Sequence, residues 1–163
     1  MKKIKLTQGQ FALIDNEDFE RVSKYKWHAD YNKTTKSYYA KTTPYIGHNK
    51  SKNIRMHRFI MNVPRVLQVD HINKNTLDNR KSNLRFCTRE QNMWNSKSRS
   101  GTSKYKGVSF DKQKKKWMAR ISSNRKIMHI GYYISQKDAA IAYNKKAKKI
   151  HGDFAFLNLI GVN

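Results

Sequence analysis

Asp70, His71 and Asn92 are the residues of this chain whose types and spacing could carry out a hydrolytic reaction. The carboxylate of Asp70 and the amide oxygen of Asn92 are hard ligands of the kind that divalent cations prefer. His71 follows Asp70 directly, and its imidazole is largely neutral near physiological pH, so it could take a proton from water. A divalent ion and a base at one place are the minimum equipment for hydrolysing a phosphodiester.

A strand–loop–strand–helix pattern over residues 67–95 must position these groups. We predict a strand at 67–69, a polar loop rich in asparagine at 70–82, a second strand at 84–87 and a helix after Thr88. Successive residues of a strand point to opposite faces. Asp70 and His71 can therefore serve one site only if the chain turns there, and we expect such a turn.

The run DHINKNTLDNRKSNLRFCTREQNMWN, which begins at Asp70, resembles the HNH or ββα-metal nucleases, especially the free-standing and intron-encoded endonucleases of phages. The ordered groups D-H, D-N-R, N-L-R and T-x-x-x-N carry this resemblance. It implies that His71 is the general base and that Asp70 and Asn92 bind one Mg²⁺ or Mn²⁺. It also implies that Asn83, the middle N of the family name, bridges the loop and holds the base in place.

The family name leads us to expect a histidine on the final helix, where this chain has Asn92. Replacing an imidazole by an amide oxygen shifts the preference from zinc towards harder ions. Asn95 lies one helical turn later and stays open as the alternative ligand. Of the other histidines, we expect His57 to be packed or at the surface rather than at a phosphate.

Charge indicates the partner. Lysine and arginine number 35 against 11 acidic residues, for a formal net charge of +24, and both halves of the chain are basic. Such self-repulsion favours a polyanionic partner, although charge alone equally allows a ribosomal or packaging protein. Cys87 is the only cysteine, which excludes an intrachain disulfide and a multi-thiolate zinc site. We expect a cytoplasmic protein, in the host cell if phage-encoded, without a membrane segment.

The organisation predicted is an α+β fold in two domains joined by a linker. Residues 1–95 form the nuclease domain, and the apolar-free run SKSRSGTSK at 96–104 is the linker. Residues 105–163 form a small domain in which three antiparallel strands pack on one helix. The expected elements are strands at 4–6, 11–14, 27–30, 37–42, 105–110, 116–122 and 127–133, helices at 16–26 and 136–149, and either a strand at 54–57 or a helix at 55–61.

The last segment resembles the plant ethylene-response-factor (Apetala-type) DNA-binding domain. The shared marks are Y-K-G-V at 105–108, W-M-A-R-I at 117–121, I-G-Y-Y at 130–133, A-A-x-A-Y at 139–143 and A-F-L-N at 155–158. The resemblance implies that the three-stranded sheet lies in the major groove of double-stranded DNA, which a β-ribbon fits.

This resemblance also implies contact residues. Lys106, Arg120, Arg125 and Lys126 are the expected DNA contacts, and Gly107 is expected to permit close backbone approach. Where plant members have two arginines and a tryptophan, this chain has Ser109, Asp111 and His129. The resemblance therefore implies how the sheet docks on DNA, and it does not imply which bases the protein prefers.

Together these patterns predict a site-directed, homing-type DNA endonuclease of phage kind that acts as a monomer and nicks one strand. A non-catalytic, sequence-specific DNA-binding regulator that kept the nuclease fold is the first alternative. An RNA-binding structural protein, favoured only by charge, is the second.

Overall fold

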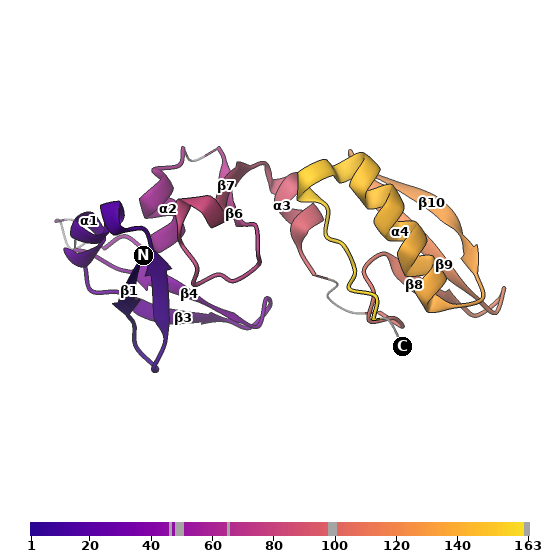
Figure 1. The fold of residues 1–163 in the computed structure, drawn as a ribbon, viewed down its shortest axis with the longest axis horizontal. Helices are drawn as coiled ribbons and strands as arrows, with labels where there is room; N and C mark the ends of the chain where they lie inside the picture. Colours follow the sequence, from indigo (N-terminus) through magenta and orange to yellow (C-terminus); the bar gives the residue numbers. More distant parts are fainter. Residues whose placement is uncertain (46, 48–50, 65, 98–100, 162–163) are drawn as a thin grey trace. The chain divides into compact units, whose positions relative to one another are not determined.

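The chain forms two compact units of mixed α and β structure, Met1–Thr88 and Arg89–Asn163, shown in a computed structural model (Figure 1). The structure describes residues 1–45, 47, 51–64, 66–97 and 101–161. Three residues of the predicted linker, 98–100, lie outside the described residues. The α+β fold class predicted from the sequence is confirmed.

The first unit consists of short antiparallel sheets and short helices. Strands β1 and β2 form a hairpin, β3, β4 and β5 form a sheet in that order, and β6 pairs with β7. The strands are β1 (Lys2–Lys5), β2 (Phe11–Ile14), β3 (His28–Asn32), β4 (Ser37–Thr42), β5 (Ile54–Arg55), β6 (Gln68–His71) and β7 (Leu84–Cys87). The helices are α1 (Phe19–Ser23) and α2 (Met56–Met61), with 3-10 turns at Asn16–Asp18 and Lys81–Asn83.

Two local predictions are refined by the structure. The helix expected over 16–26 is a 3-10 turn followed by the five-residue α1. It ends early because the backbone N–H of Tyr25 and the indole N–H of Trp27 both donate to the Val22 carbonyl, at 3.2 and 2.8 Å. Of the two alternatives for residues 54–61, the helix is the one formed, after a two-residue strand.

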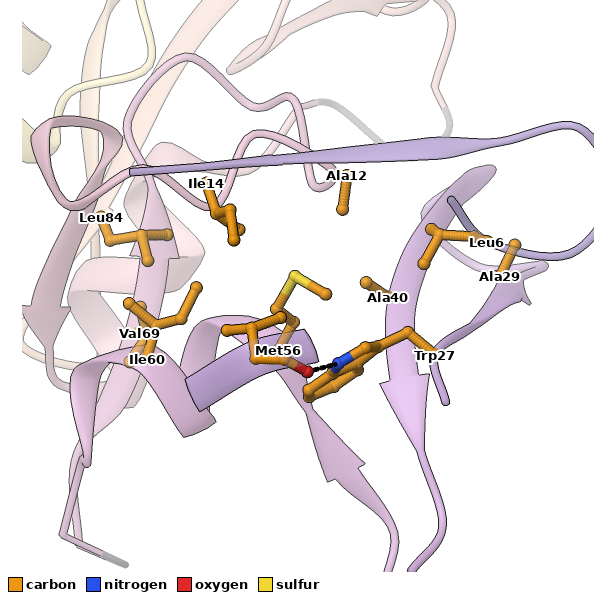
Figure 2. Packing of buried hydrophobic residues seen from close by; sticks show 11 residues of the cluster. Leu6, Ala12, Ile14, Trp27, Ala29, Ala40, Met56, Ile60, Val69 and Leu84 are labelled. Atoms are coloured by element: carbon orange, nitrogen blue, oxygen red, sulfur yellow. Dashed lines mark hydrogen bonds between the residues drawn. The ribbon is translucent and has the colours of Figure 1, made fainter. Parts of the chain in front are cut away.

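One apolar core joins the elements of this unit. Figure 2 shows Ile14, Met56 and Val69 pointing into the same interior from β2, α2 and β6. The buried members supply apolar area whose removal from water stabilises the fold. They are Leu6, Ala12, Ile14, Val22, Trp27, Ala29, Ala40, Met56, Ile60, Val69 and Leu84.

The second unit is a three-stranded antiparallel sheet covered by one long helix (Figure 1). The strands are β8 (Val108–Asp111), β9 (Lys116–Ser123) and β10 (Lys126–Tyr133), in the order β10-β9-β8. The helix is α4 (Gln136–His151), preceded in the chain by α3 (Arg89–Asn95) and followed by a 3-10 turn at Gly152–Phe154. This confirms the predicted sheet-on-helix arrangement. No helix in the described part of the chain is long and apolar enough to cross a membrane.

Side-chain alternation gives the sheet of the second unit an inner and an outer face. Ala119 and Ile121 of β9 are buried, while Arg120 between them is exposed. Small residues of α4, including Ala139 and Ala140, let the helix lie close to the sheet. Ser135 begins the helix, because its side chain accepts the Lys137 N–H at 3.0 Å.

Candidate active site

The β6–β7 hairpin carries Asp70 and His71. Antiparallel pairing places Asp70 opposite Arg85 and His71 opposite Leu84. The turn predicted at Asp70 is wrong, because ladder pairing continues through His71 and the chain turns only afterwards, where Lys74 N–H donates to the His71 carbonyl at 3.0 Å. Side chains alternate along a strand, but the turn predicted from the sequence proves unnecessary for the two groups to interact. The charge of the Asp70 carboxylate acts on the pKa of His71, so both remain within reach of one site.

Asp70 is held by an arginine of the facing strand. Its carboxylate is 6% exposed, and Nε and Nη2 of Arg85 donate to Oδ2 at 2.9 and 2.7 Å. Hydrogen bonds between charged partners are the stronger kind, and this pair fixes the direction of the carboxylate. Arg85 had no role among the residues expected from the sequence, although the N-L-R group contains it.

Asn79 orients the imidazole of His71. The His71 Nε2 lies 3.2 Å from the Asn79 Oδ1, and the Asn79 amide donates to the Leu77 carbonyl at 3.2 Å. With its N–H₂ group committed to that carbonyl, Asn79 presents its oxygen to the ring. Because Asn79 presents an oxygen acceptor, this contact favours the neutral tautomer that carries its proton on Nε2.

His71 is kept neutral by its surroundings. The side chain is 5% exposed, and burial lowers its pKa below the usual 6.5, while the hydrogen bond to Asn79 and the charges of Asp70 and Asp78 raise it in part. Because burial is the largest of these causes, the unprotonated form dominates at neutral pH. An imidazole in that state is able to accept a proton.

Two further rings surround His71. The rings of His57 and His71 meet edge to face at 5.0 Å, and Tyr39 lies 6.0 Å from the first and 6.4 Å from the second. Of the two positions expected for His57, packed or at the surface, the structure shows the packed one, with 6% of the residue exposed. Burial, followed by the nearby His71, Arg55 and Arg58, lowers its pKa well below the usual value.

Asn83 spans the loop between the strands. Its Oδ1 accepts the Asn73 backbone N–H at 2.9 Å, and its amide donates to the Asp78 carbonyl at 2.8 Å. The residue therefore ties the two sides of the loop together, while Asn79 Oδ1 is the group that lies against His71 Nε2. Asn79 stands within the D-N-R group of the sequence, but it was not among the residues expected to have a function.

The N-terminal hairpin supports this loop from outside. The Leu13 N–H donates to the Leu77 carbonyl, and the Asn79 N–H donates to the Leu13 carbonyl, both at 2.8 Å. Farther along, the Asp15 carboxylate accepts the Lys81 N–H at 2.7 Å. The sequence of residues 1–62 contains no chemical signature of its own. In the structure, β2 of this segment fixes the backbone of Asn79, which orients His71.

Helix α3 carries Asn92 and Asn95 and belongs to the second unit. Asn92 is half-buried and Asn95 is 4% exposed. Trp94, between them in sequence, stacks on His151 of α4 with ring centroids 4.3 Å apart and planes 9° apart. Burial lowers the pKa of His151, which favours the neutral ring in this stack.

Lys106 closes the C-terminal end of α3. Its ammonium donates to the carbonyls of Met93, Trp94 and Ser96 at 3.0, 2.6 and 2.7 Å. Carbonyls at a helix end lack intrahelical donors, and a cation is favourable there. The contact of Lys106 with DNA that the sequence led us to expect stays a prediction. The structure shows that the same ammonium also holds the end of α3.

The other residues expected to contact DNA lie at two kinds of position. Arg120, Arg125 and Lys126 are exposed, on the outer sheet face and in the β9–β10 turn. Gly107 has φ +75°, and a Cβ there would lie 2.2 Å from the Tyr143 ring. The close approach that this glycine permits in the fold is to Tyr143.

The donor types at Asp70 and Asn92 suit a hard divalent cation. A carboxylate oxygen and an amide oxygen are typical ligands of Mg²⁺ or Mn²⁺. Zinc sites are instead typically built from thiolates and imidazoles. Within the described residues, no group of three or more histidine, cysteine or acidic side chains could hold a metal. A site of one carboxylate and one amide would not require such a group.

Comparison with known proteins agrees with this chemistry. Residues 62–94, which include β6, the loop, β7 and most of α3, match the family described as HNH endonuclease. The chain is also 30% identical over 159 residues to a protein of Acanthamoeba polyphaga mimivirus named as an uncharacterised HNH endonuclease, covering 94% of this chain and 77% of that one.

A second relative comes from a bacterial virus. Protein 3.8 of Escherichia phage T7 is 30% identical over 94 residues, which is 57% of this chain and 77% of the phage protein. The mimivirus relative extends over both units of the present structure. The chain therefore belongs to the HNH endonucleases, a family of metal-dependent phosphodiesterases.

Proposed function

We propose that this protein is a site-directed endonuclease that nicks double-stranded DNA with His71 as the general base and one divalent cation. The observation that carries the proposal is the environment of His71, whose Nε2 lies 3.2 Å from Asn79 Oδ1 and whose pKa is lowered by burial. A proton taken from water at Nδ1 would leave a hydroxide to attack phosphorus.

Asp70 and Asn92 are the residues proposed to hold the cation, with Asn95 as the alternative to Asn92. When bound, Mg²⁺ or Mn²⁺ would neutralise charge developing on the phosphate and on the leaving 3′ oxygen. Arg85 contributes by fixing the Asp70 carboxylate through Oδ2. Asn83 holds the loop, and Asn79 holds the base.

One general base in each chain predicts that each chain cuts one strand. One His71 activates one water, so a monomer would nick one strand, and two copies meeting on one duplex would produce a double-strand break. We place the enzyme among the homing-type endonucleases of viruses and phages. The mimivirus and T7 relatives are viral proteins, which supports the viral part of this setting.

The second unit is proposed to select the DNA locus. Its sheet would dock in the major groove as in ethylene-response-factor domains, with Arg120, Arg125 and Lys126 on exposed positions of the outer face and turn. Tethering the nuclease to a DNA reader raises its effective concentration at one site.

One observation favours the alternative of a non-catalytic DNA-binding regulator. The His71 imidazole is 5% exposed, and a general base must be reached by water. The nuclease proposal therefore requires DNA or metal binding to admit water to Nδ1.

Incubation of supercoiled plasmid with the full chain separates the two functions. With Mg²⁺ the endonuclease converts supercoiled plasmid to open circles bearing 5′-phosphate and 3′-hydroxyl ends, which DNA ligase reseals. With EDTA, conversion stops. A protein that shifts the plasmid in a gel but produces no open circles with Mg²⁺ or Mn²⁺ is the regulator.

A further inference from the structure

The sheet β3–β4–β5 has one face in the core and a second face that is partly open, with Tyr39 on it packed against the His57 and His71 rings. Ala29 and Ala40 pack into the interior of the first unit. Side chains alternate along a strand, so Asp30, Tyr39 and Lys41 extend from the opposite face. Antiparallel register pairs Lys41 with Arg55, which brings two cationic side chains together on this open face.

An open groove with a volume of about 400 Å³ lies at this face. Its lining is Asp30, Lys41, Asn53, Arg55 and Arg58. Among the described residues of this lining, three cations therefore face one carboxylate. The Lys41 ammonium lies 3.8 Å from the Asp30 carboxylate, a separation that offsets part of the charge and leaves an excess of positive charge in the groove.

The arginines of the groove are held in place by neutral groups. Arg58 donates through Nη1 to the Leu67 carbonyl at 3.0 Å, and this bond leaves its positive charge uncompensated. The Arg55 guanidinium stacks on the Tyr39 ring at 4.5 Å. A guanidinium oriented by stacking loses less freedom when it binds an anion, and its planar fork matches phosphate oxygens.

The Tyr39 ring connects this groove to His71. Tyr39 carries Arg55 on its face and lies with its centroid 6.4 Å from the His71 ring. The phosphates of one DNA strand follow one another at about 3.4 Å of axial rise per nucleotide. A strand whose scissile phosphate lies at His71 would thus bring a phosphate a few nucleotides away to the groove.

We propose that the groove formed by Lys41, Arg55 and Arg58 binds a backbone phosphate of the strand being cut, close to the scissile bond. The inference rests on the proposed nuclease function and adds a second point of attachment in the first unit. Phosphate contacts fix register and orientation and carry no base information. The groove would therefore position the scissile bond against His71 without reading sequence.

The test uses the full chain and two charge-matched double variants. Lys41→Gln with Arg55→Gln removes two charges and the 3.8 Å ion pair of Lys41 with Asp30. Lys3→Gln with Lys24→Gln removes two exposed charges outside the groove and a 3.8 Å ion pair with Glu20. Binding of a fluorescein-labelled duplex is followed by anisotropy against NaCl concentration, together with plasmid nicking.

We expect the groove variant to bind about tenfold more weakly than the control variant near 0.1 M salt. The slope of log affinity against log salt should fall by about 0.9 for each phosphate that the variant no longer neutralises. Lys41→Arg with Arg55→Lys keeps both charges and should restore the slope, which a folding defect in the glutamine variant would not explain.

The two failures are distinguishable. If the groove variant matches the control variant in affinity and slope, the phosphate site is refuted, whether or not the wild-type chain nicks plasmid. If the wild-type chain binds duplex through the groove but never nicks, the nuclease proposal is refuted, and the groove stands as a phosphate site of a protein that binds DNA without cutting it.

Discussion

His71 has the properties of a general base because of the residues around it, and not because of its position beside Asp70 alone. Asn79 sets the tautomer, β2 fixes the backbone of Asn79, and burial keeps the ring unprotonated. The same burial limits access of water. The side chain that orients the base is therefore the most informative residue to change after the base itself.

Asn79→Ala should lower the single-turnover nicking rate by about ten- to a hundredfold, the usual cost of removing a partner that orients a functional histidine. DNA affinity should stay unchanged, because Asn79 is 1% exposed and offers nothing to DNA. Asn79→Asp keeps an oxygen acceptor for Nε2–H and should retain more activity than the alanine variant. Equal rates for Asn79→Ala and wild type would show that the imidazole is oriented without this bond.

His57 makes the stability of the first unit depend on pH. Its pKa is lowered in the fold, so between about 6.5 and that lower value the unfolded chain binds a proton that the folded chain does not. Stability is therefore highest above 6.5 and falls as the pH decreases through this window, by about 1.4 kcal/mol per pH unit for each such histidine.

Urea unfolding at several pH values between 7.5 and 5 measures this dependence. His57→Gln has no titrating ring and should lose stability more gradually on acidification than wild type, with the remaining slope due to other buried histidines such as His71. A variant whose slope equals that of wild type would mean that His57 is accessible to protons in the folded chain.

At the scale of elements, α3 is held by the C-terminal part of the chain. Lys106 closes its end, Trp94 stacks on His151, and the Phe156 N–H donates to the Trp94 carbonyl at 3.3 Å. The helix that carries the proposed ligand Asn92 is thus part of the same compact unit as the proposed DNA reader. That unit would both select the locus and support a metal ligand.

Lys106→Met tests this support. It keeps the aliphatic length of the side chain and leaves three carbonyls without their cationic donor, which should cost about 1–3 kcal/mol. Chemical unfolding monitored by tryptophan fluorescence gives the value, and Lys112→Met in the exposed β8–β9 turn is the charge-matched control. Equal stability of the two variants would show that Lys106 does not stabilise α3.

Gly107 is a second residue with a structural role in the second unit. A Cβ at this position would lie 2.2 Å from the Tyr143 ring and 2.6 Å from the Arg120 carbonyl, in a backbone conformation that L side chains rarely adopt. Gly107→Ala should therefore destabilise the second unit by about 3 kcal/mol or more. Gly101→Ala, with no neighbour closer than 4.0 Å, should leave the melting temperature nearly unchanged. Similar melting temperatures for both would contradict the packing described.

The sequence predicted the elements with strong local signals and missed what depends on tertiary contact. Strands β2, β4 and β7 and the long helix α4 follow from their apolar patterns and turn residues. The turn expected at Asp70 did not form, because pairing with β7 extends the strand by two residues, which no local signal reports. Asn79, Arg85 and His57 reach the site from loop, strand and helix, and only the folded chain brings them there.

At the scale of the whole molecule, both units carry cationic surface and each has a proposed DNA contact of its own. Arg120, Arg125 and Lys126 belong to the proposed reader, and Lys41, Arg55 and Arg58 line the groove of the first unit. A net charge of +24 makes electrostatic attraction to DNA the first contribution to binding. In the proposed mechanism, however, cutting depends on the single imidazole of His71.

The most direct test is the single-turnover rate at which the full chain nicks supercoiled plasmid with saturating Mg²⁺, compared with His71→Ala. We expect the variant to bind the plasmid as tightly as wild type and to nick it at least about a hundredfold more slowly, the smallest usual contribution of a general base. Equal nicking rates for the two proteins would contradict the proposed mechanism, because cleavage would then proceed without the group on which every proposed step depends.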